Sequence, residues 1–163
     1  MLDGLDCFWR ARMWSDLSLL PPAQRSKALP YILQWAEAGA KLSGVEVVRG
    51  FNATMAIRAA AAKLFCELDY VISPVSPVVN FPAEFAAPLN DPAKPFEHIA
   101  YTVPWNMSEN PAASINGGYD KKGFPIGVQL IGRRFDDLGV LAMAKAFEGL
   151  RDPQKPWPNP PGE

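Results

Sequence analysis

The sequence of 163 residues is poor in the groups that build metal centres and disulfide frameworks, because it holds two cysteines and a single histidine. It also lacks a run of charge of one sign: 16 Lys and Arg residues are balanced by 17 Asp and Glu residues, for a formal net charge of −1. Because a phosphate backbone is bound by clustered Lys and Arg, we expect no nucleic-acid partner. No segment reaches the roughly 18 consecutive apolar residues that a membrane-spanning helix needs, so we expect no membrane partner.

The first twenty residues do not resemble a secretion signal, which needs an unbroken apolar stretch. Five charged residues interrupt them, namely Asp3, Asp6, Arg10, Arg12 and Asp16. We therefore expect a cytoplasmic protein. Cys7 and Cys66 both fall in segments of helical periodicity, so we expect no disulfide.

Common motifs of catalytic and nucleotide-binding sites are absent as well. The sequence contains no phosphate-binding loop, no dinucleotide-binding fingerprint, no Gly-x-Ser-x-Gly elbow and no His-Glu-x-x-His pair, so we expect no cofactor and no metal. A thiol and an imidazole are available in Cys7 or Cys66 with His98, which leaves an unrelated Cys-His enzyme as one alternative. Two core cysteines and a loop histidine are the interpretation that we favour, because small buried cysteines are common.

Apolar periodicity predicts helices in the first 69 residues. One apolar stripe runs from Leu2 to Leu20 and ends at Pro21-Pro22. A second helix is expected to start at Pro30, because proline is favoured in the first helical turn.

The third helix has the clearest signal. Ser43 and Glu46 are spaced as a capping box, in which each side chain binds the backbone amide of the other residue. Behind this start an apolar stripe recurs at helical spacing for about six turns and predicts a long helix. Its members are Val48, Phe51, Met55, Ala59, Ala62 and Cys66.

The pattern changes at Tyr70 to short β-branched runs. Residues 70–73 predict a strand that is buried on both faces. The segment from Pro74 to Pro104 is rich in proline, too long for a plain connection, and is expected to wrap a scaffold or line a site. Residues 112–115 and 126–131 flank a glycine-rich turn and predict an antiparallel hairpin. Asp136 is expected to cap a last helix.

Together these elements predict one domain over residues 1–163. Its expected parts are helices over 1–69, strands and a proline-rich loop over 70–135, a helix over 136–150 and a tail over 151–163. Three apolar strands make a narrow sheet with exposed edges, which is unfavourable. Such a chain would seek further strands, either from a partner or from a missing stretch of its own gene.

Three segments carry a resemblance to a known family. They are Asp69–Pro77 (DYVISPVSP), Tyr101–Ser114 (YTVPWNMSENPAAS) and Gly123–Asp136 (GFPIGVQLIGRRFD). In this order they resemble the C-terminal portion of the amidase signature family, serine amidohydrolases that include fatty-acid amide hydrolase and a glutamyl-tRNA amidotransferase subunit. The resemblance implies an α/β fold class, here the C-terminal part of a three-layer α/β/α fold with a mixed β-sheet and outer helices.

The resemblance also implies where the chemistry of the family lies. Its attacking serine, a second serine in a cis peptide and a lysine belong to a glycine- and serine-rich stretch of the N-terminal part, which nothing in this sequence matches. The serines at positions 73, 76, 108 and 114 lie among prolines or in a predicted strand, without a Gly-Ser-Ser context. We therefore assign no catalytic residue and expect the chain alone to be inactive.

This part of the family contributes sheet strands and one wall of the substrate pocket. In glutamine-using members, an arginine one turn before the glycine that matches Gly39 and an acidic residue shortly before the threonine that matches Thr102 hold the substrate. Trp35 and Ile99 stand near those positions here, so the resemblance implies a parent enzyme that prefers a hydrophobic or aromatic carboxamide. The expected substrate-binding residues are Trp35, Ile99, Thr102, Trp105 and Asn106.

Two departures from the family pattern concern local turns. Glu109 stands where many members have glycine, and Asn116 stands where proline is usual. The favoured function is a C-terminal amidase fragment that works on a small-molecule carboxamide together with its missing N-terminal part. The alternative is a non-catalytic interaction module that pairs with another copy, as a homo-oligomer, or with a catalytic partner.

Overall fold

The N-terminal part of the chain is helical, as predicted. The computed structural model describes residues 2–78, 80–156 and 159–160. The helices of this part are α1 (Leu2–Ser18), α2 (Pro22–Arg25), α3 (Pro30–Glu37), the 3-10 turn η1 (Ala38–Lys41) and α4 (Gly44–Leu64). Proline stands in the first turn of α2 and α3, where its missing N–H leaves no intrahelical bond unmade. Residues 157–158 and 161–163 of the predicted tail lie outside the described residues.

The predicted capping box at the start of α4 is confirmed. The backbone N–H of Ser43 donates to Glu46 Oε2 at 2.8 Å, and the backbone N–H of Glu46 donates to Ser43 Oγ at 3.3 Å. These two hydrogen bonds satisfy amides that the first turn of a helix leaves without partners. The hydrogen bonds from Ser43 also hold the pKa of Glu46 below its ordinary value.

The predicted helix is confirmed, but the apolar stripe that indicates it is not its buried face. All six members of the expected stripe are exposed, and the buried residues are Gly50, Thr54, Ile57 and Ala61. The reason is close packing of α1 on the small residues of α4: a Cβ added to Gly50 would lie 2.3 Å from the carbonyl oxygen of Gly4. When a helix carries apolar residues on two adjacent sides, the side that a neighbouring helix can approach most closely is the one that becomes buried.

The strands are β1 (Val71–Pro74), β2 (Ala112–Tyr119) and β3 (Pro125–Ile131), in the order β1-β3-β2. The predicted hairpin is confirmed, with Ala112 opposite Ile131 and Ser114 opposite Gln129. Both pairings are antiparallel, so among the described strands there is no parallel pair of the kind that a mixed sheet contains.

The expectation that β1 is buried on both faces is wrong. Ile72 is 53% exposed, because β1 is an edge strand and helix α6 (Asp137–Leu150) packs against β2 and β3 instead. Asp136 caps α6 as predicted, since its side chain accepts a hydrogen bond of 3.1 Å from the Gly139 N–H.

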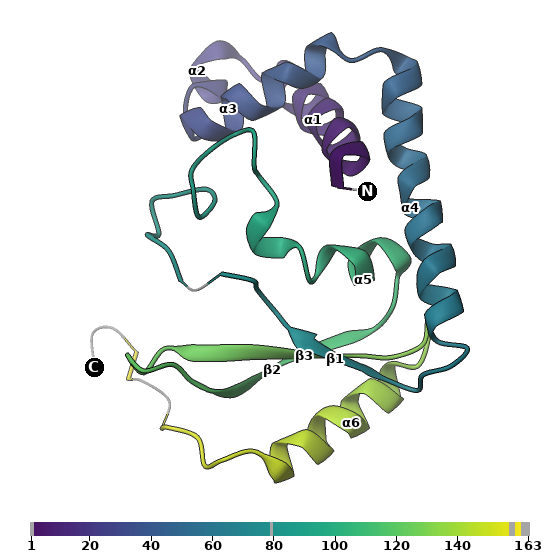
Figure 1. Ribbon diagram of the computed structural model, residues 1–163. Coiled ribbons are helices and arrows are strands. Elements are labelled where there is room, and N and C mark those ends of the chain that lie inside the picture. The colour runs from purple at the N-terminus through teal and green to yellow at the C-terminus, as the bar shows by residue number, and fades with distance from the viewer. Residues whose placement is uncertain (1, 79, 157–158, 161–163) are drawn as a thin grey trace.

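The α/β fold class and the layered arrangement are confirmed. Figure 1 shows α6 on one side of the sheet and helix α5 (Val103–Ser108) on the other. The apolar side chains of Leu130 and Ile131 in β3 are completely buried. Trp105 lies in α5, which carries Pro104 in its first turn.

The helical region contains two apolar clusters that meet at Trp9. One joins Leu5, Ile57 and Val103, and the other contains Trp35 with Leu17 and Ala36. Trp9 packs against both clusters, and its ring stands edge-on to Phe96 at 4.8 Å between centroids. The 3-10 turn η2 (Glu97–Ile99) and the proline-rich segment are thereby tied to the helices.

Both departures from the family pattern occupy distinctive backbone positions. Glu109 ends α5 in the left-handed conformation, with φ of 61°, where glycine is the easiest residue to accommodate. Its carboxylate forms ion pairs with Arg58 of α4 and with Arg134 beyond β3. Asn116 lies at a register shift of β2, and its Oδ1 accepts a hydrogen bond of 3.0 Å from the Gly118 N–H.

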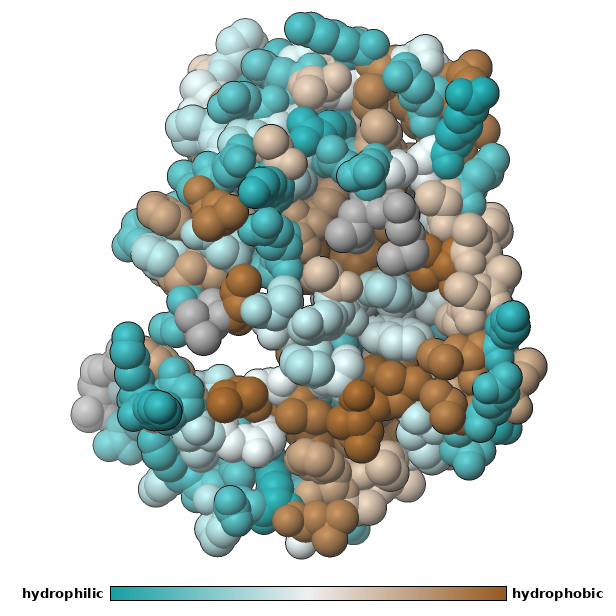
Figure 2. All heavy atoms as spheres, in the orientation of Figure 1, coloured by the Kyte–Doolittle hydropathy of each residue, from teal (hydrophilic) through white to brown (hydrophobic). Residues whose placement is uncertain are grey.

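The molecule exposes much surface for its size. Its accessible area is 10917 Å², whereas a compact monomer of this mass would expose about 8,000 Å². Figure 2 shows apolar side chains at the surface beside the sheet and along the edge formed by α4. Among the described residues, none of the helices combines the length and the apolar character that a membrane crossing requires.

Candidate functional site

A small hollow separates α5 from the sheet. Its volume is about 220 Å³, and it is lined by Thr102, the N-cap of α5, and by Trp105 and Asn106 of α5. Three of the five residues that the sequence predicts for substrate binding therefore lie at one place. The remaining lining residues are Val75, Asn110, Ala112, Ala113, Ser114 and Gln129.

The side chains of α5 are held by local contacts. Thr102 Oγ1 donates to the carbonyl oxygen of Ile99 at 3.1 Å, and Asn106 Nδ2 donates to the carbonyl oxygen of Thr102 at 3.2 Å. The Trp105 ring stands edge-on to Phe65 of the α4 C-cap, with 6.1 Å between centroids. The hollow thus presents an aromatic ring, a hydroxyl and an amide, a combination that suits a neutral ligand with an apolar part.

Gln129 joins the sheet to α5 at the hollow. Its Nε2 lies 2.8 Å from Ser73 Oγ, 3.1 Å from the carbonyl oxygen of Pro74 and 2.7 Å from the carbonyl oxygen of Tyr101. The residue is only 3% exposed. Sequence reasoning missed Gln129, although a polar side chain in the middle of the apolar run from Ile126 to Ile131 was a visible signal.

The four serines considered in the sequence have their own hydrogen bonds or none. Ser108 is fully buried, and its Oγ donates to Asn110 Oδ1 at 2.6 Å, while Asn110 Nδ2 donates to the carbonyl oxygen of Gly132 at 2.8 Å. Ser73 accepts from Gln129, and Ser76 Oγ donates to the carbonyl oxygen of Val78 at 3.0 Å. In the described part of the chain no basic side chain is hydrogen-bonded to these hydroxyls.

Trp35 and Ile99 lie outside the hollow. Trp35 is 7% exposed in the α1–α3 cluster, and its Nε1 donates to Asp6 Oδ1 at 2.8 Å. Ile99 packs against the cluster that contains Leu5 and Val103. The structure therefore places these two expected pocket residues in the helical core.

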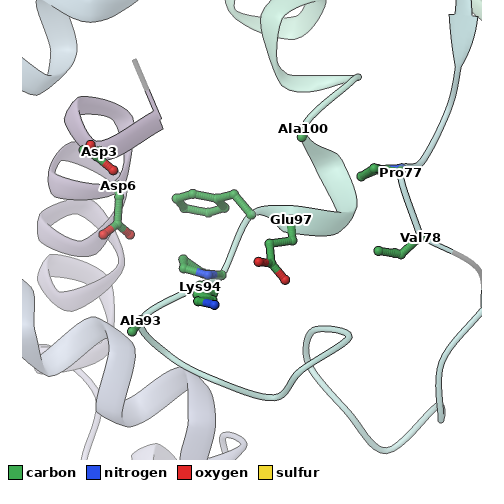
Figure 3. Close-up of a pocket in the computed structure, with 10 residues that line it drawn as sticks. Asp3, Asp6, Pro77, Val78, Ala93, Lys94, Glu97 and Ala100 are labelled. Carbon is green, nitrogen blue, oxygen red and sulfur yellow. The ribbon is translucent and has the colours of Figure 1, made fainter.

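A larger pocket of about 580 Å³ lies between the start of α1 and the proline-rich segment (Figure 3). Asp3 and Asp6 stand on one side, and Glu97, Pro77 and Val78 face them from the other. Asp6 is already engaged, because Arg10 Nε donates to its Oδ2 at 2.7 Å and Trp35 donates to its other oxygen. The other residues that line this larger pocket are Ala93, Lys94, Pro95, Phe96 and Ala100.

Arg10 and Tyr31 fasten the proline-rich segment to the helices. Arg10 Nη2 donates to the carbonyl oxygen of Pro92 at 2.8 Å, and Tyr31 Oη donates to the carbonyl oxygen of Asp91 at 3.3 Å. Burial, and secondarily the Asp91 carboxylate, raise the pKa of Tyr31. The hydroxyl therefore stays protonated and keeps its donor role at neutral pH.

A third hollow of about 510 Å³ lies between residues 74–81 and the β2–β3 hairpin. Val75 borders both this hollow and the small one beneath α5, while Pro77 and Val78 border both this hollow and the large pocket. Figure 2 shows the opening between the proline-rich segment and the hairpin. The prediction that this segment wraps a scaffold or lines a site agrees with this placement.

The proposed thiol and imidazole are engaged separately. The Cys66 Sγ donates to the carbonyl oxygen of Ala62 at 3.4 Å, and the His98 ring packs edge-on against Phe81 at 5.7 Å. No hydrogen bond joins a cysteine to His98 in the described ranges, and these ranges hold no cluster of His, Cys, Asp and Glu suited to a metal ion.

Comparison with known proteins identifies the family. Residues 15–141 match the family model described as Amidase. The chain is 35% identical over 96 residues to a glutamyl-tRNA(Gln) amidotransferase subunit of Myxococcus xanthus, an alignment that covers 59% of this chain and 19% of the relative. The corresponding protein of Syntrophomonas wolfei is 38% identical over 101 residues, covering 62% and 20%. The chain thus spans about a fifth of the length of these relatives.

Solved structures show the same fold. A bacterial aryl acylamidase of the amidase signature family matches 91% of this chain with 33% of its own, at a TM-score of 0.73 and 21% identity. The glutamyl-tRNA(Gln) amidotransferase subunit of Thermotoga maritima matches 82% of this chain with 28% of its own, at a TM-score of 0.59 and 25% identity. By its sequence and by the arrangement of its helices and strands, this chain belongs to the amidase signature family.

Proposed function

We propose that this chain is the C-terminal part of an amidase signature domain that hydrolyses a carboxamide. In this proposal it supplies sheet strands and one wall of the substrate pocket, and the attacking serine, the second serine and the lysine come from a separate N-terminal portion. The observation that carries the proposal is the hollow beneath α5, where Thr102, Trp105 and Asn106 gather beside the sheet.

The hollow suits the leaving-group or acyl side of a neutral amide. None of its lining residues carries a charge, so a charged substrate end would lose its hydration without gaining a counter-ion. The Trp105 ring can pack against an apolar or aromatic group, and the Thr102 hydroxyl and Asn106 amide can hydrogen-bond a carbonyl or an N–H. The fold match to an enzyme named aryl acylamidase is consistent with this preference.

The role of Gln129 in this proposal is to position the wall. It holds the carbonyl oxygen of Tyr101, which directly precedes Thr102, against β3. Because Gln129 is buried and reaches both β1 and the start of α5, it can keep the pocket wall at a set distance from the sheet. Precise placement of a pocket wall matters in catalysis, since small displacements of bound substrate lower the rate strongly.

The test is complementation. The N-terminal portion of the solved aryl acylamidase, ending before the region that this chain matches, is co-expressed with this chain, and release of the amine from an anilide is compared with release of ammonia from glutamine. We expect turnover of the anilide by the pair and none by either chain alone. Hydrolysis by the isolated chain that disappears on changing one of its own serines or cysteines would contradict the proposal.

The wall residues provide a finer readout. Trp105→Ala in the pair should raise KM for the anilide, because the substitution removes ring contact without touching the attacking group. Ser18→Ala, at the exposed end of α1, is the control and should leave KM unchanged. An unchanged KM for Trp105→Ala would contradict the proposal that α5 forms a wall of the substrate pocket.

A further inference from the structure

An apolar stripe runs along the exposed side of α4. Val48 is 58% exposed, Phe51 is 47% exposed and Met55 is 44% exposed, and each is a large apolar side chain. Ala59, Ala62 and Cys66 continue the line and are also exposed. These six residues are called the α4 stripe below.

The shape of the α4 stripe fits a second helix. Its members are three or four positions apart, so those from Val48 to Ala62 lie on one side of α4 over a length of about 21 Å. Cys66 follows in the turn just after Leu64, the last residue of the helix. Side chains at this spacing form the ridges and grooves into which an adjoining helix packs. The adjacent, buried sector of α4 already receives α1 in this way, through Gly50, and the Phe51 ring at the border of the stripe packs against Phe8 of α1 with 5.3 Å between centroids.

The exposed area is larger than a free monomer of this mass normally presents. The accessible area of 10917 Å² exceeds the expected value by about 2,900 Å². A specific interface of standard size removes about 800 Å² from each partner, so the excess is enough for more than one such contact. Large exposed apolar patches usually mark places where another surface binds.

Charge on one side of the stripe indicates which partner fits, because the helical spacing puts Arg49 and Lys63 on the same side, the one away from α1. Arg49 and Lys63 of α4 form no ion pair among the described residues, and the one carboxylate of this helix, Glu46, is engaged by Ser43. A second copy of the chain would bring its own Arg49 and Lys63 to an interface that already holds these cations, which is unfavourable. A helix with acidic residues beside its apolar line would be complementary.

The matched solved structures supply the source of such a helix. This chain corresponds to only 33% of the aryl acylamidase chain, and two thirds of that chain therefore lie outside the match. We propose that the α4 stripe is covered by an amphipathic helix, with acidic residues along one side of its apolar line, that belongs to the N-terminal portion of an amidase signature domain. This inference rests on the proposed function and names the surface through which the two portions bind.

Two adjacent alanines make a matched test. Ala59 lies on the stripe and Ala60 lies beside it on the polar side, and both are exposed in the middle of α4. Ala59→Glu and Ala60→Glu therefore add the same charge to the same helix. The binding partner is the N-terminal portion of the aryl acylamidase, and the measurements are the dissociation constant and the alkylation rate of the Cys66 thiol, followed by mass spectrometry.

We expect the partner to bind this chain and to slow alkylation of Cys66, which lies at the end of the stripe. Ala59→Glu should weaken binding about tenfold or more, since it would place an unpaired carboxylate in an apolar contact. Ala60→Glu should change binding by less than about twofold, as most surface substitutions do. Circular dichroism of both variants checks that α4 is intact.

Four results would overturn the inference: no binding, equal binding of the two variants, unchanged alkylation of Cys66 in the complex, or protection of Cys66 in the free chain that grows with its own concentration. The last would assign the stripe to a second copy. Activity is scored separately. A complex that forms through the stripe but hydrolyses no carboxamide would contradict the proposed function and leave the inference about the stripe intact. An active complex whose dissociation constant does not change with Ala59→Glu would contradict the inference about the stripe and leave the proposed function intact.

Discussion

Gln129→Leu tests whether the candidate pocket wall is held as the structure indicates. The Gln129 amide lies within hydrogen-bond distance of three acceptors, on Ser73, Pro74 and Tyr101. Leucine has a similar volume and donates nothing, so the substitution removes the hydrogen bonds while leaving little empty space. The three contacts join segments that are far apart in the sequence, which makes them sensitive to tertiary structure.

The magnitude follows from the hydrogen-bond count. The two hydrogens of the amide can serve two of the three acceptors fully at any moment, and each such bond contributes about 1 kcal/mol net. Leucine regains part of this through apolar burial but leaves carbonyl oxygens in the interior without donors. We therefore expect Gln129→Leu to lower the free energy of unfolding by about 1–3 kcal/mol.

Urea unfolding followed by circular dichroism measures this change, and amide hydrogen exchange locates it. Exchange should accelerate most at Thr102 and the first turn of α5, because that turn loses its connection to β3. Gln34→Leu is the control, since Gln34 is exposed in α3, and we expect it to shift stability by less than about 0.5 kcal/mol. Equal unfolding midpoints for the two variants would refute the role given to Gln129.

Three further changes follow from local geometry. Glu109→Ala and Glu109→Gly both lose the two arginine partners, and only alanine keeps a side chain in the left-handed conformation. Glu109→Ala should therefore be the less stable of the two in thermal melts, by about 1 kcal/mol. Ser43→Ala should lower the melting temperature at neutral pH. The pKa of Glu46 is lowered in the folded state, so the capping interaction of Glu46 stabilises the fold above the ordinary glutamate pKa and is lost as pH falls through the lowered value. The melting temperatures of the wild type and the variant should therefore converge in acid. Gly50→Val should destabilise by about 1–3 kcal/mol, because its Cβ would collide with the Gly4 carbonyl; a melting temperature equal to that of the wild type would show that α1 and α4 are not in close contact.

The family and most helix and strand positions could be predicted from the sequence because their causes are local. Ser43 and Glu46 need only each other to form a capping box, and proline at position 30 is favoured in a first helical turn by its fixed φ. The hairpin was predictable for the same reason, since its two strands are joined by a short turn. Helix α5 was missed because it is a single short element at the end of the proline-rich segment.

The candidate site was predictable in part. Thr102, Trp105 and Asn106 are close in sequence, at the N-cap and in the first turn of one helix. A family resemblance that places one of them in a pocket therefore places the other two there as well. Trp35 belongs to a distant helix, and only the path of the chain decides that it packs in the helical core. Gln129 gains its role from acceptors 28 to 56 residues away, which no local pattern indicates.

The sequence by itself determined the family, the helix starts and the hairpin, because short-range spacing and backbone chemistry are sufficient for them. Only the tertiary structure decided which side of α4 is buried. Both sides carry apolar residues at helical spacing, and periodicity cannot rank them. Close approach of α1 at Gly50 selects the side with small residues and leaves the larger side chains of the α4 stripe exposed. Burial is a property of two surfaces together, and the sequence of one helix describes only one of them.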